Sequence, residues 1–347
     1  MDESPRLLRN GTVDIAVHPT TIEALSGVMP QLHLPVTDSY QFHPTVGARS
    51  GSMQIEGIWQ DYQVKMDLIK FMSGWLRMCG TNTLKEETEA ASFLYDRIAN
   101  GYPLPSELHI MPTTEGALYN IGSGLNLATL ARKMPDELKS EILIPAAFLY
   151  STDVKTGRTF VSDILSQIPR SGQDEFISTR LIQPIMSAWN YFLSLEDPEK
   201  GHTGLAFEMH GANFYYVWDS VLQTIRGDIL TKDFASNRIL SAHTPKRSLE
   251  WVLGEYDHGL SYLFLAPLVS ELSRSTGKPT GYFDAIIRES FIQSLTARNK
   301  QKFLLNGSVV SVHQDVFDQL QHFRSPRQKL WTKTPRFRPS ELPAYDL

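Results

Sequence analysis

Hydrophobic and polar positions follow two different periods along the chain, which predicts a protein of mixed α and β structure. Three short apolar runs, residues 204–207, 214–218 and 227–231, have the length and composition of buried strands. Polar residues separate these runs, so we expect a small antiparallel sheet whose polar side chains gather at the strand ends. Residues 107–111 predict a further strand.

Apolar residues that recur every three to four positions predict helices on both sides of this sheet segment. The longest such pattern covers residues 174–195 and places six large apolar side chains on one face. The same spacing predicts helices over residues 60–78, 86–99, 125–135, 249–256, 259–273 and 282–295. With the strands, these helices indicate an α+β protein, and we place a boundary between two lobes near residue 140.

Polar residues that could bind a metal ion or take part in a reaction lie where the predicted strands end. Glu208 and His210 follow the first strand, and alternation in an extended segment would point both to one side, with Met209 facing the core. Magnesium prefers carboxylate oxygens combined with substrate phosphates, which suits Glu208 and Asp233. His210 could donate to a phosphate or to a developing charge. A structural His–Glu pair at a sheet end explains the same spacing equally well.

A second candidate is Arg49, in the glycine- and serine-rich stretch GARSGS. A fork-shaped guanidinium on such a turn is suited to a phosphate, although a solvated surface turn has the same composition. Both interpretations stay open.

Composition narrows the classes of protein that fit. The chain has 347 residues, of which 41% are hydrophobic and 20% charged, as in ordinary globular proteins. A net charge of −5 argues against nucleic acid as a partner, and the single cysteine, Cys79, excludes an internal disulfide. We find no signal-peptide pattern and no apolar run long enough to span a bilayer, so we expect a cytoplasmic protein without a membrane partner.

The segment GLAFEMHGAN resembles the glycine–apolar–E-A-H-x-Q-N motif of the NRPS-independent siderophore synthetases, the aerobactin synthetase (IucA/IucC) family. ILTKDF resembles the arginine–aspartate step of that family. The resemblance implies that Glu208 and Asp233 hold magnesium and that His210 and Asn213 bind ATP, with His210 in a catalytic role. Two positions depart from the pattern: Ala212 stands in place of a glutamine, and Lys232 replaces the arginine.

Two weaker matches concern arginines. LARKMP, followed by EILIPAAFLY, resembles the I-L-R-E-x-P and V-x-P-A-A-L-L runs of the family, which implies that Arg132 faces phosphates or carboxylates. A helix-end cation that interacts with the helix dipole is the alternative for Arg132. HPTVGARSG resembles an H-P-x-x-K-x-R-x-G phosphate motif, with Gly47 in place of the lysine, and this match again nominates Arg49.

The family resemblance carries an expected architecture. It implies a fingers-like α+β lobe over residues 1–140 and a palm-like helical lobe over residues 141–347 that contains the small sheet and the site. The match is best between residues 125 and 233. Because family members are much longer, we expect most of their amino-terminal lobe to be missing here.

The implied function is an ATP- and magnesium-dependent ligase. It would activate a citrate-like carboxylate as an acyl-adenylate, which an amine or an alcohol then attacks in siderophore biosynthesis. A non-catalytic homologue or partner subunit that binds nucleotide or carboxylate is the alternative, and Ala212 and Gly47 favour it. Whether the chain acts as a homodimer or with a complementing subunit stays open.

Overall fold

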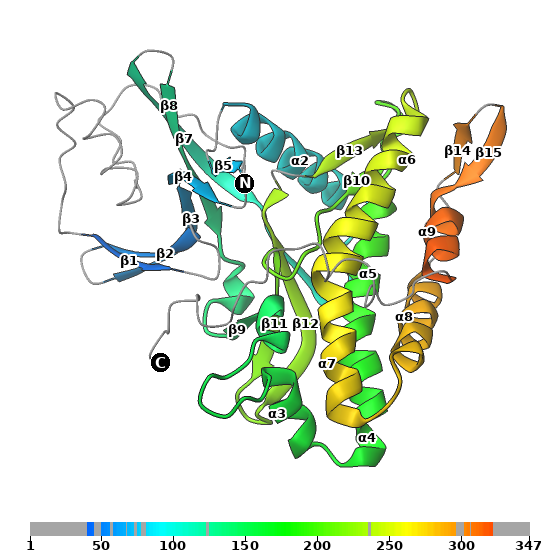
Figure 1. Cartoon of the computed structure of the whole chain (residues 1–347). Coiled ribbons are helices and arrows are strands. Elements are labelled where there is room, and N and C mark those ends of the chain that lie inside the picture. Colours follow the sequence, from blue (N-terminus) through cyan, green and yellow to red (C-terminus); the bar gives the residue numbers. More distant parts are fainter. Residues whose placement is uncertain are drawn as a thin grey trace.

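The structure is a computed structural model. It describes residues 40–44, 50–55, 58–66, 68–72, 75–77, 81–122, 125–234, 237–295, 302–305 and 307–321. The α+β class predicted from the sequence is confirmed (Figure 1). No helix within these ranges is long and apolar enough to cross a membrane.

The first sheet lies in the amino-terminal part and is antiparallel throughout. Within the described residues its strand order is β1-β2-β3-β8-β7. A separate hairpin, β4–β5, follows β3. The bounds are β1 (Tyr40–Pro44), β2 (Ser50–Ile55), β3 (Ile58–Met66), β4 (Leu68–Met72), β5 (Trp75–Arg77), β7 (Thr113–Gly122) and β8 (Leu125–Lys133).

Two predicted helices, over residues 60–78 and 125–135, are wrong. The described residues of the first segment belong to β3, β4 and β5, and residues 125–133 form β8. Strand β8 pairs with β7 on one edge and with β3 on the other, so its backbone hydrogen bonds are supplied by distant segments. The apolar spacing in both segments was compatible with either period. Pairing between strands, which local spacing does not encode, decided the outcome.

The second sheet has the order β6-β12-β11-β9 and lies in the centre of the molecule (Figure 1). Strands β11 and β12 pair antiparallel, as predicted. Strand β9, which the sequence analysis did not predict, pairs antiparallel with β11, and β6 joins parallel to β12. The first of the three predicted strands, β10, lies apart from this sheet and pairs with β13. The bounds are β6 (Leu108–Met111), β9 (Ile142–Pro145), β10 (His202–Ala206), β11 (Phe214–Asp219), β12 (Thr224–Lys232) and β13 (Arg238–Ser241), with a hairpin β14 (Lys302–Leu305) and β15 (Ser308–Ser311).

The helices confirm most of the predicted pattern. In Figure 1, α4, α5 and α7 stand on one side of the second sheet, whereas α2 contacts β7, β8 and β13. Two π-helical segments, Ile177–Ile182 and Glu255–Leu265, continue directly into α5 and α7. The α-helices are α2 (Thr81–Ala99), α3 (Phe160–Gln167), α4 (Arg170–Phe176), α5 (Gln183–Leu193), α6 (Pro245–Gly254), α7 (Ala266–Thr276), α8 (Thr280–Ser294) and α9 (Val312–Gln321); 3₁₀ turns cover Asp136–Leu138 and Ala146–Tyr150.

The main hydrophobic core is built around α5. Its apolar face is fully buried, as the spacing predicted, with Trp189 and Phe192 at 0% exposure. Leu94 of α2 and Leu108 of β6 join the same core. The core therefore contains elements from both sides of residue 140, and the boundary placed there stays a prediction.

His109 links β6 to the neighbouring strand β12 and to the 3₁₀ turn Asp136–Leu138. Its Nδ1 lies 3.0 Å from a carboxylate oxygen of Glu137, and its Nε2 lies 3.9 Å from Asp228. The carboxylate of Asp228 raises the pKa of His109; burial opposes this, and Glu137 adds to it. The protonated ring thus stabilises the fold, fully below a pH of about 6.5, and loses this contribution as the pH rises through the higher folded-state pKa.

We predict that His109→Gln flattens the dependence of stability on pH. The free energy of unfolding of the unsubstituted chain should fall as the pH rises above about 6.5 and through the higher folded-state pKa of His109, and the variant should lack that fall. Urea unfolding at several pH values measures it. His243→Gln, at an exposed position, is the control. An equal slope in the two variants would contradict the role of His109.

Candidate functional site

Three phenylalanines that pack against one another anchor the two segments that carry the predicted site. Phe207 precedes Glu208, and Phe234 follows Asp233. Both rings pack on Phe192 of α5, with centroids 4.6 Å and 6.2 Å away, and they lie 5.1 Å from each other. All three are fully buried, and each contributes about 1.5–3 kcal/mol of burial energy. The same hydrophobic contact therefore fixes the residue before Glu208 and the residue after Asp233.

Asn213 holds the segment after β10 in place. Its side-chain amide donates to the main-chain oxygen of Glu208 (3.0 Å), and its own carbonyl accepts from the N–H of Lys232 (2.9 Å). On the other side, the N–H of Glu208 donates to the amide oxygen of Asn237 (3.0 Å). Asn213 thus ties this loop to β12, and its contact with a nucleotide stays a prediction.

Gly211 allows the loop to pack against the 3₁₀ turn Ala146–Tyr150. Its carbonyl accepts from the N–H of Ala147 (2.8 Å). A Cβ at this position would lie 2.7 Å from the hydroxyl of Tyr150 and 2.9 Å from the backbone nitrogen of Ala147. These distances are too short for any side chain, so glycine is required for this close approach.

The backbone defines the protonation of His210. Its Nδ1 accepts a hydrogen bond from the N–H of Ala212 (3.2 Å), so the proton of the neutral ring sits on Nε2. Burial lowers the pKa of His210, against the opposing charges of Glu208 and Asp233. The ring is therefore neutral near pH 7, with Nε2–H as a donor 3.8 Å from a carboxylate oxygen of Glu208.

Side-chain exposure agrees with the alternation expected from the sequence. The side chains of Glu208 and His210 are 26% and 25% exposed, whereas Met209 between them is fully buried. The loop thus presents a carboxylate and a neutral imidazole at its accessible side.

Asp233 lies at the centre of a buried charge network. Its Oδ1 contacts the Lys65 amine at 2.5 Å and an Arg132 guanidinium nitrogen at 3.2 Å. Arg132 also donates to Glu87 through Nε (3.0 Å) and Nη2 (2.7 Å), and Thr113 donates to the same oxygen. Burial would raise the pKa of Asp233, but the charges of Lys65 and Arg132 hold it far below its usual range. The carboxylate is permanently ionised.

Lys232 gives this network an excess of positive charge. It is 3% exposed, donates to the side-chain oxygen of Gln63 (3.2 Å), and lies 5.0 Å from the centre of the Tyr215 ring. Both of these contacts are with neutral groups. Among the side chains that the structure describes, the charge network of Lys65, Glu87, Arg132, Lys232 and Asp233 therefore holds three cations against two carboxylates, and such an arrangement favours an anion nearby.

Two backbone features mark this region as unusual. Asp233 has a φ of 67°, a left-handed conformation that non-glycine residues seldom adopt. The π-helix Glu255–Leu265 faces the loop and places Gly259 next to the backbone of Met209. A Cβ added at Gly259 would lie 3.7 Å from the backbone nitrogen of Met209. Both features are more frequent at functional sites than elsewhere.

Glu255 is a titratable group that the sequence did not nominate. Glu255 is the first residue of the π-helix. A Cβ added at Gly259 would lie 3.5 Å from Oε2 of Glu255 and 3.9 Å from Cγ of Glu208. Burial and the charge of Glu208 raise the pKa of Glu255 to about 7. The two carboxyl groups thus lie over the same glycine.

The structure brings Glu208, His210, Asn213, Arg132 and Asp233 into one region, as predicted. Arg132 lies in strand β8 at 0% exposure, so the alternative of a helix-end cation is wrong. The remaining nominee, Arg49, lies outside the described residues, and its phosphate contact stays a prediction. Among the described residues, no three His, Cys, Asp or Glu side chains are arranged to hold a metal ion by themselves.

Lys65 and Glu87 were missed by the sequence analysis. Glu87 had a visible signal: it shares the buried stripe of α2 with Ala90, Ala91 and Leu94, where an unpaired carboxylate is costly. Lys65 had none, because residues 60–78 were predicted to be helical.

Comparison with known proteins gives a fold and no sequence family. No protein-family model and no curated protein matches the chain. Among solved structures, it is similar to the petrobactin biosynthesis protein AsbB from Bacillus anthracis str. Sterne, with a TM-score of 0.61 and 15% identity over 88% of this chain and 53% of that one.

Two structures from Klebsiella pneumoniae are also similar. Aerobactin synthetase IucC has a TM-score of 0.52 and 15% identity over 70% of this chain and 44% of its own. ATP-bound aerobactin synthetase IucA has a TM-score of 0.52 and 12% identity over 74% of this chain and 49% of its own. The chain thus spans about half the length of these proteins, and over that half it has the fold of the NRPS-independent siderophore synthetases.

Proposed function

We propose that this chain is an ATP-dependent ligase that activates a citrate-like carboxylate for condensation with an amine or an alcohol. The observation that carries this proposal is the charge network, in which Lys232 has no carboxylate partner among the described side chains and leaves one buried positive charge in excess there. A polyphosphate would supply the missing negative charge. The fold and the motif around Glu208 and His210 support the same class of reaction, because the similar solved proteins are siderophore synthetases.

Each side chain has a role in this proposal. Arg132 and Lys232 attract the phosphates or the substrate carboxylates, with Arg49 as a further phosphate ligand. His210 donates its Nε2 proton to the oxygen on which negative charge develops, which stabilises the transition state more than the bound substrates. Asn213 holds the loop next to β12, because its main-chain carbonyl accepts a hydrogen bond from the N–H of Lys232.

Magnesium would be held by Glu208 and Asp233 together with the phosphates, and it would neutralise charge on the nucleotide. The accessible carboxylate of Glu208 fits this role. Asp233 fits this role less well than Glu208, because its Oδ1 already contacts the cations Lys65 and Arg132.

A non-catalytic homologue or partner subunit is the rival function. Ala212 favours it, since the resembling motif has a glutamine at this position. Exchange of labelled pyrophosphate into ATP, dependent on citrate, separates the two. Exchange supports the ligase, and ATP binding without exchange supports the rival. Absence of ATP binding contradicts the ligase and leaves the rival only as a protein that binds a carboxylate.

We predict that Lys232→Met weakens ATP binding by roughly tenfold or more, about 1.4 kcal/mol. The substitution removes the cation that has only neutral side-chain partners. Calorimetric titration with ATP and magnesium measures the effect. Lys232→Arg, which keeps the charge, should retain most of the affinity. If ATP binds Lys232→Met as tightly as the unsubstituted chain, the charge network is not the phosphate site.

We predict that His210→Ala lowers pyrophosphate exchange by about 100-fold or more, while ATP affinity changes much less. The ring donates to charge that exists only in the transition state, so binding of the ground state is nearly unaffected. His243→Ala is the matched control at an exposed histidine. Thermal unfolding is measured on the same preparations. A loss of stability with normal exchange per folded molecule would assign His210 a packing role only.

A further inference from the structure

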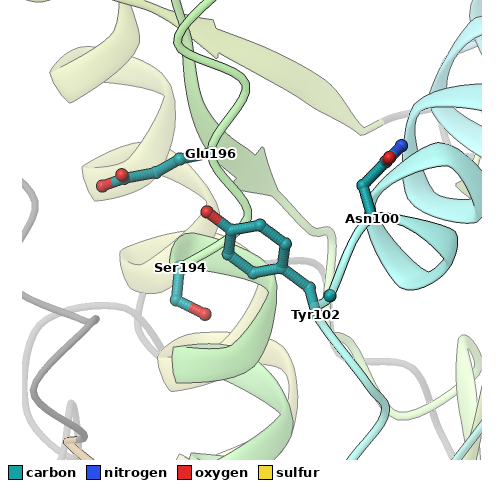
Figure 2. Close-up of a pocket in the computed structure, with 5 residues that line it drawn as sticks. Asn100, Tyr102, Ser194 and Glu196 are labelled. Atoms are coloured by element: carbon teal, nitrogen blue, oxygen red, sulfur yellow. The ribbon is translucent and has the colours of Figure 1, made fainter.

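A pocket formed by residues outside the candidate site lies where helices α2 and α5 end. It has a volume of about 430 Å³ and is lined by Asn100, Gly101, Tyr102, Ser194 and Glu196. In Figure 2 the hydroxyl end of Tyr102 is turned toward Ser194 and Glu196, with Asn100 on the opposite side of the ring. None of these residues takes part in the charge network or in the loop that carries His210.

The helix ends make this pocket electronegative. Helix α2 ends at Ala99 and α5 ends at Leu193, so each directs its carboxyl-terminal end to the pocket. A helix carries roughly half a negative charge at this end. Gly101, at φ 93°, terminates α2, and a Cβ built there would meet no atom within 4 Å. The glycine thus turns the chain and leaves the space open.

Glu196 adds a full negative charge that the surrounding ion pairs do not neutralise. Within the described part of the chain, its half-buried carboxylate makes no ion pair or hydrogen bond. Arg97 approaches Glu196 only at its main-chain oxygen (3.0 Å) and pairs with Asp197 (3.2 Å). Lys200 pairs with Asp96 and Asp197. Two cations and two aspartates balance, so the charge of Glu196 remains in excess.

We infer that this pocket binds an organic ammonium ion, a positively charged amine with a short apolar stem. The carboxylate of Glu196 and the two helix ends attract the ammonium group. The face of Tyr102 accepts either the cation or its stem. The site is separate from the one proposed for ATP, and the inference does not rest on the proposed function.

Binding of n-butylammonium, compared with n-butanol as a neutral molecule of the same shape, tests the charge preference. Saturation-transfer NMR on the full chain, without ATP, should give binding of butylammonium and at least tenfold weaker binding of butanol. Equal binding of the two would overturn the inference. This comparison needs no variant, so it holds even if a substitution disturbs folding.

Substitution then locates the site. Glu196→Gln keeps the size of the side chain and should reduce butylammonium affinity roughly tenfold, because it removes the uncompensated charge. Glu199→Gln, three residues on and exposed, should change nothing. Tyr102→Phe should keep the affinity, and Tyr102→Leu should lower it. Unchanged binding in Glu196→Gln, or an equal loss in Glu199→Gln, would overturn the assignment.

Discussion

The ion pairs of Asp233 join the two sheets on which the site depends. Lys65 on β3 and Arg132 on β8 come from the first sheet, whereas Asp233 follows β12 of the second. Removal of one partner of such a buried pair leaves an uncompensated charge, which costs about 3–5 kcal/mol. The Phe192–Phe207–Phe234 contact fixes the same position from the hydrophobic side. Positioning of the site and cohesion of the fold thus share the same residues.

These contacts also explain how cations and a neutral histidine coexist in a small volume. Asp233 and Glu87 compensate two of the three cations, which lets Arg132 stay at 0% exposure. Burial lowers the pKa of His210 although Glu208 and Asp233 oppose it. The result is one excess positive charge beside a neutral donor. Both properties suit the binding of an anion more than the abstraction of a proton.

The parts of the site that could be predicted from sequence are those encoded within a few residues. The strand ends at Glu208 and Asp233 and the buried face of α5 were of this kind. Strands β3 and β8 were mistaken for helices because their hydrogen bonds join residues such as Gln63 and Arg132, which are far apart in the chain. Lys65, which lies in β3, was therefore not nominated as a site residue. Glu255 gave no local signal, because its raised pKa depends on burial and on Glu208.

A shared fold does not by itself assign an activity, so the departures from the resembling motif have to be weighed one by one. At position 212 the glutamine side chain is lost, yet the backbone N–H of Ala212 still orients the ring of His210, a task open to any residue except proline. At position 232 a lysine replaces the arginine fork with a point charge, and Gln63 and Tyr215 hold it in place. Neither change alters the protonation of His210 or the sign of the charge network. Stabilisation of an anionic transition state depends on those two properties, so both substitutions are compatible with the proposed chemistry.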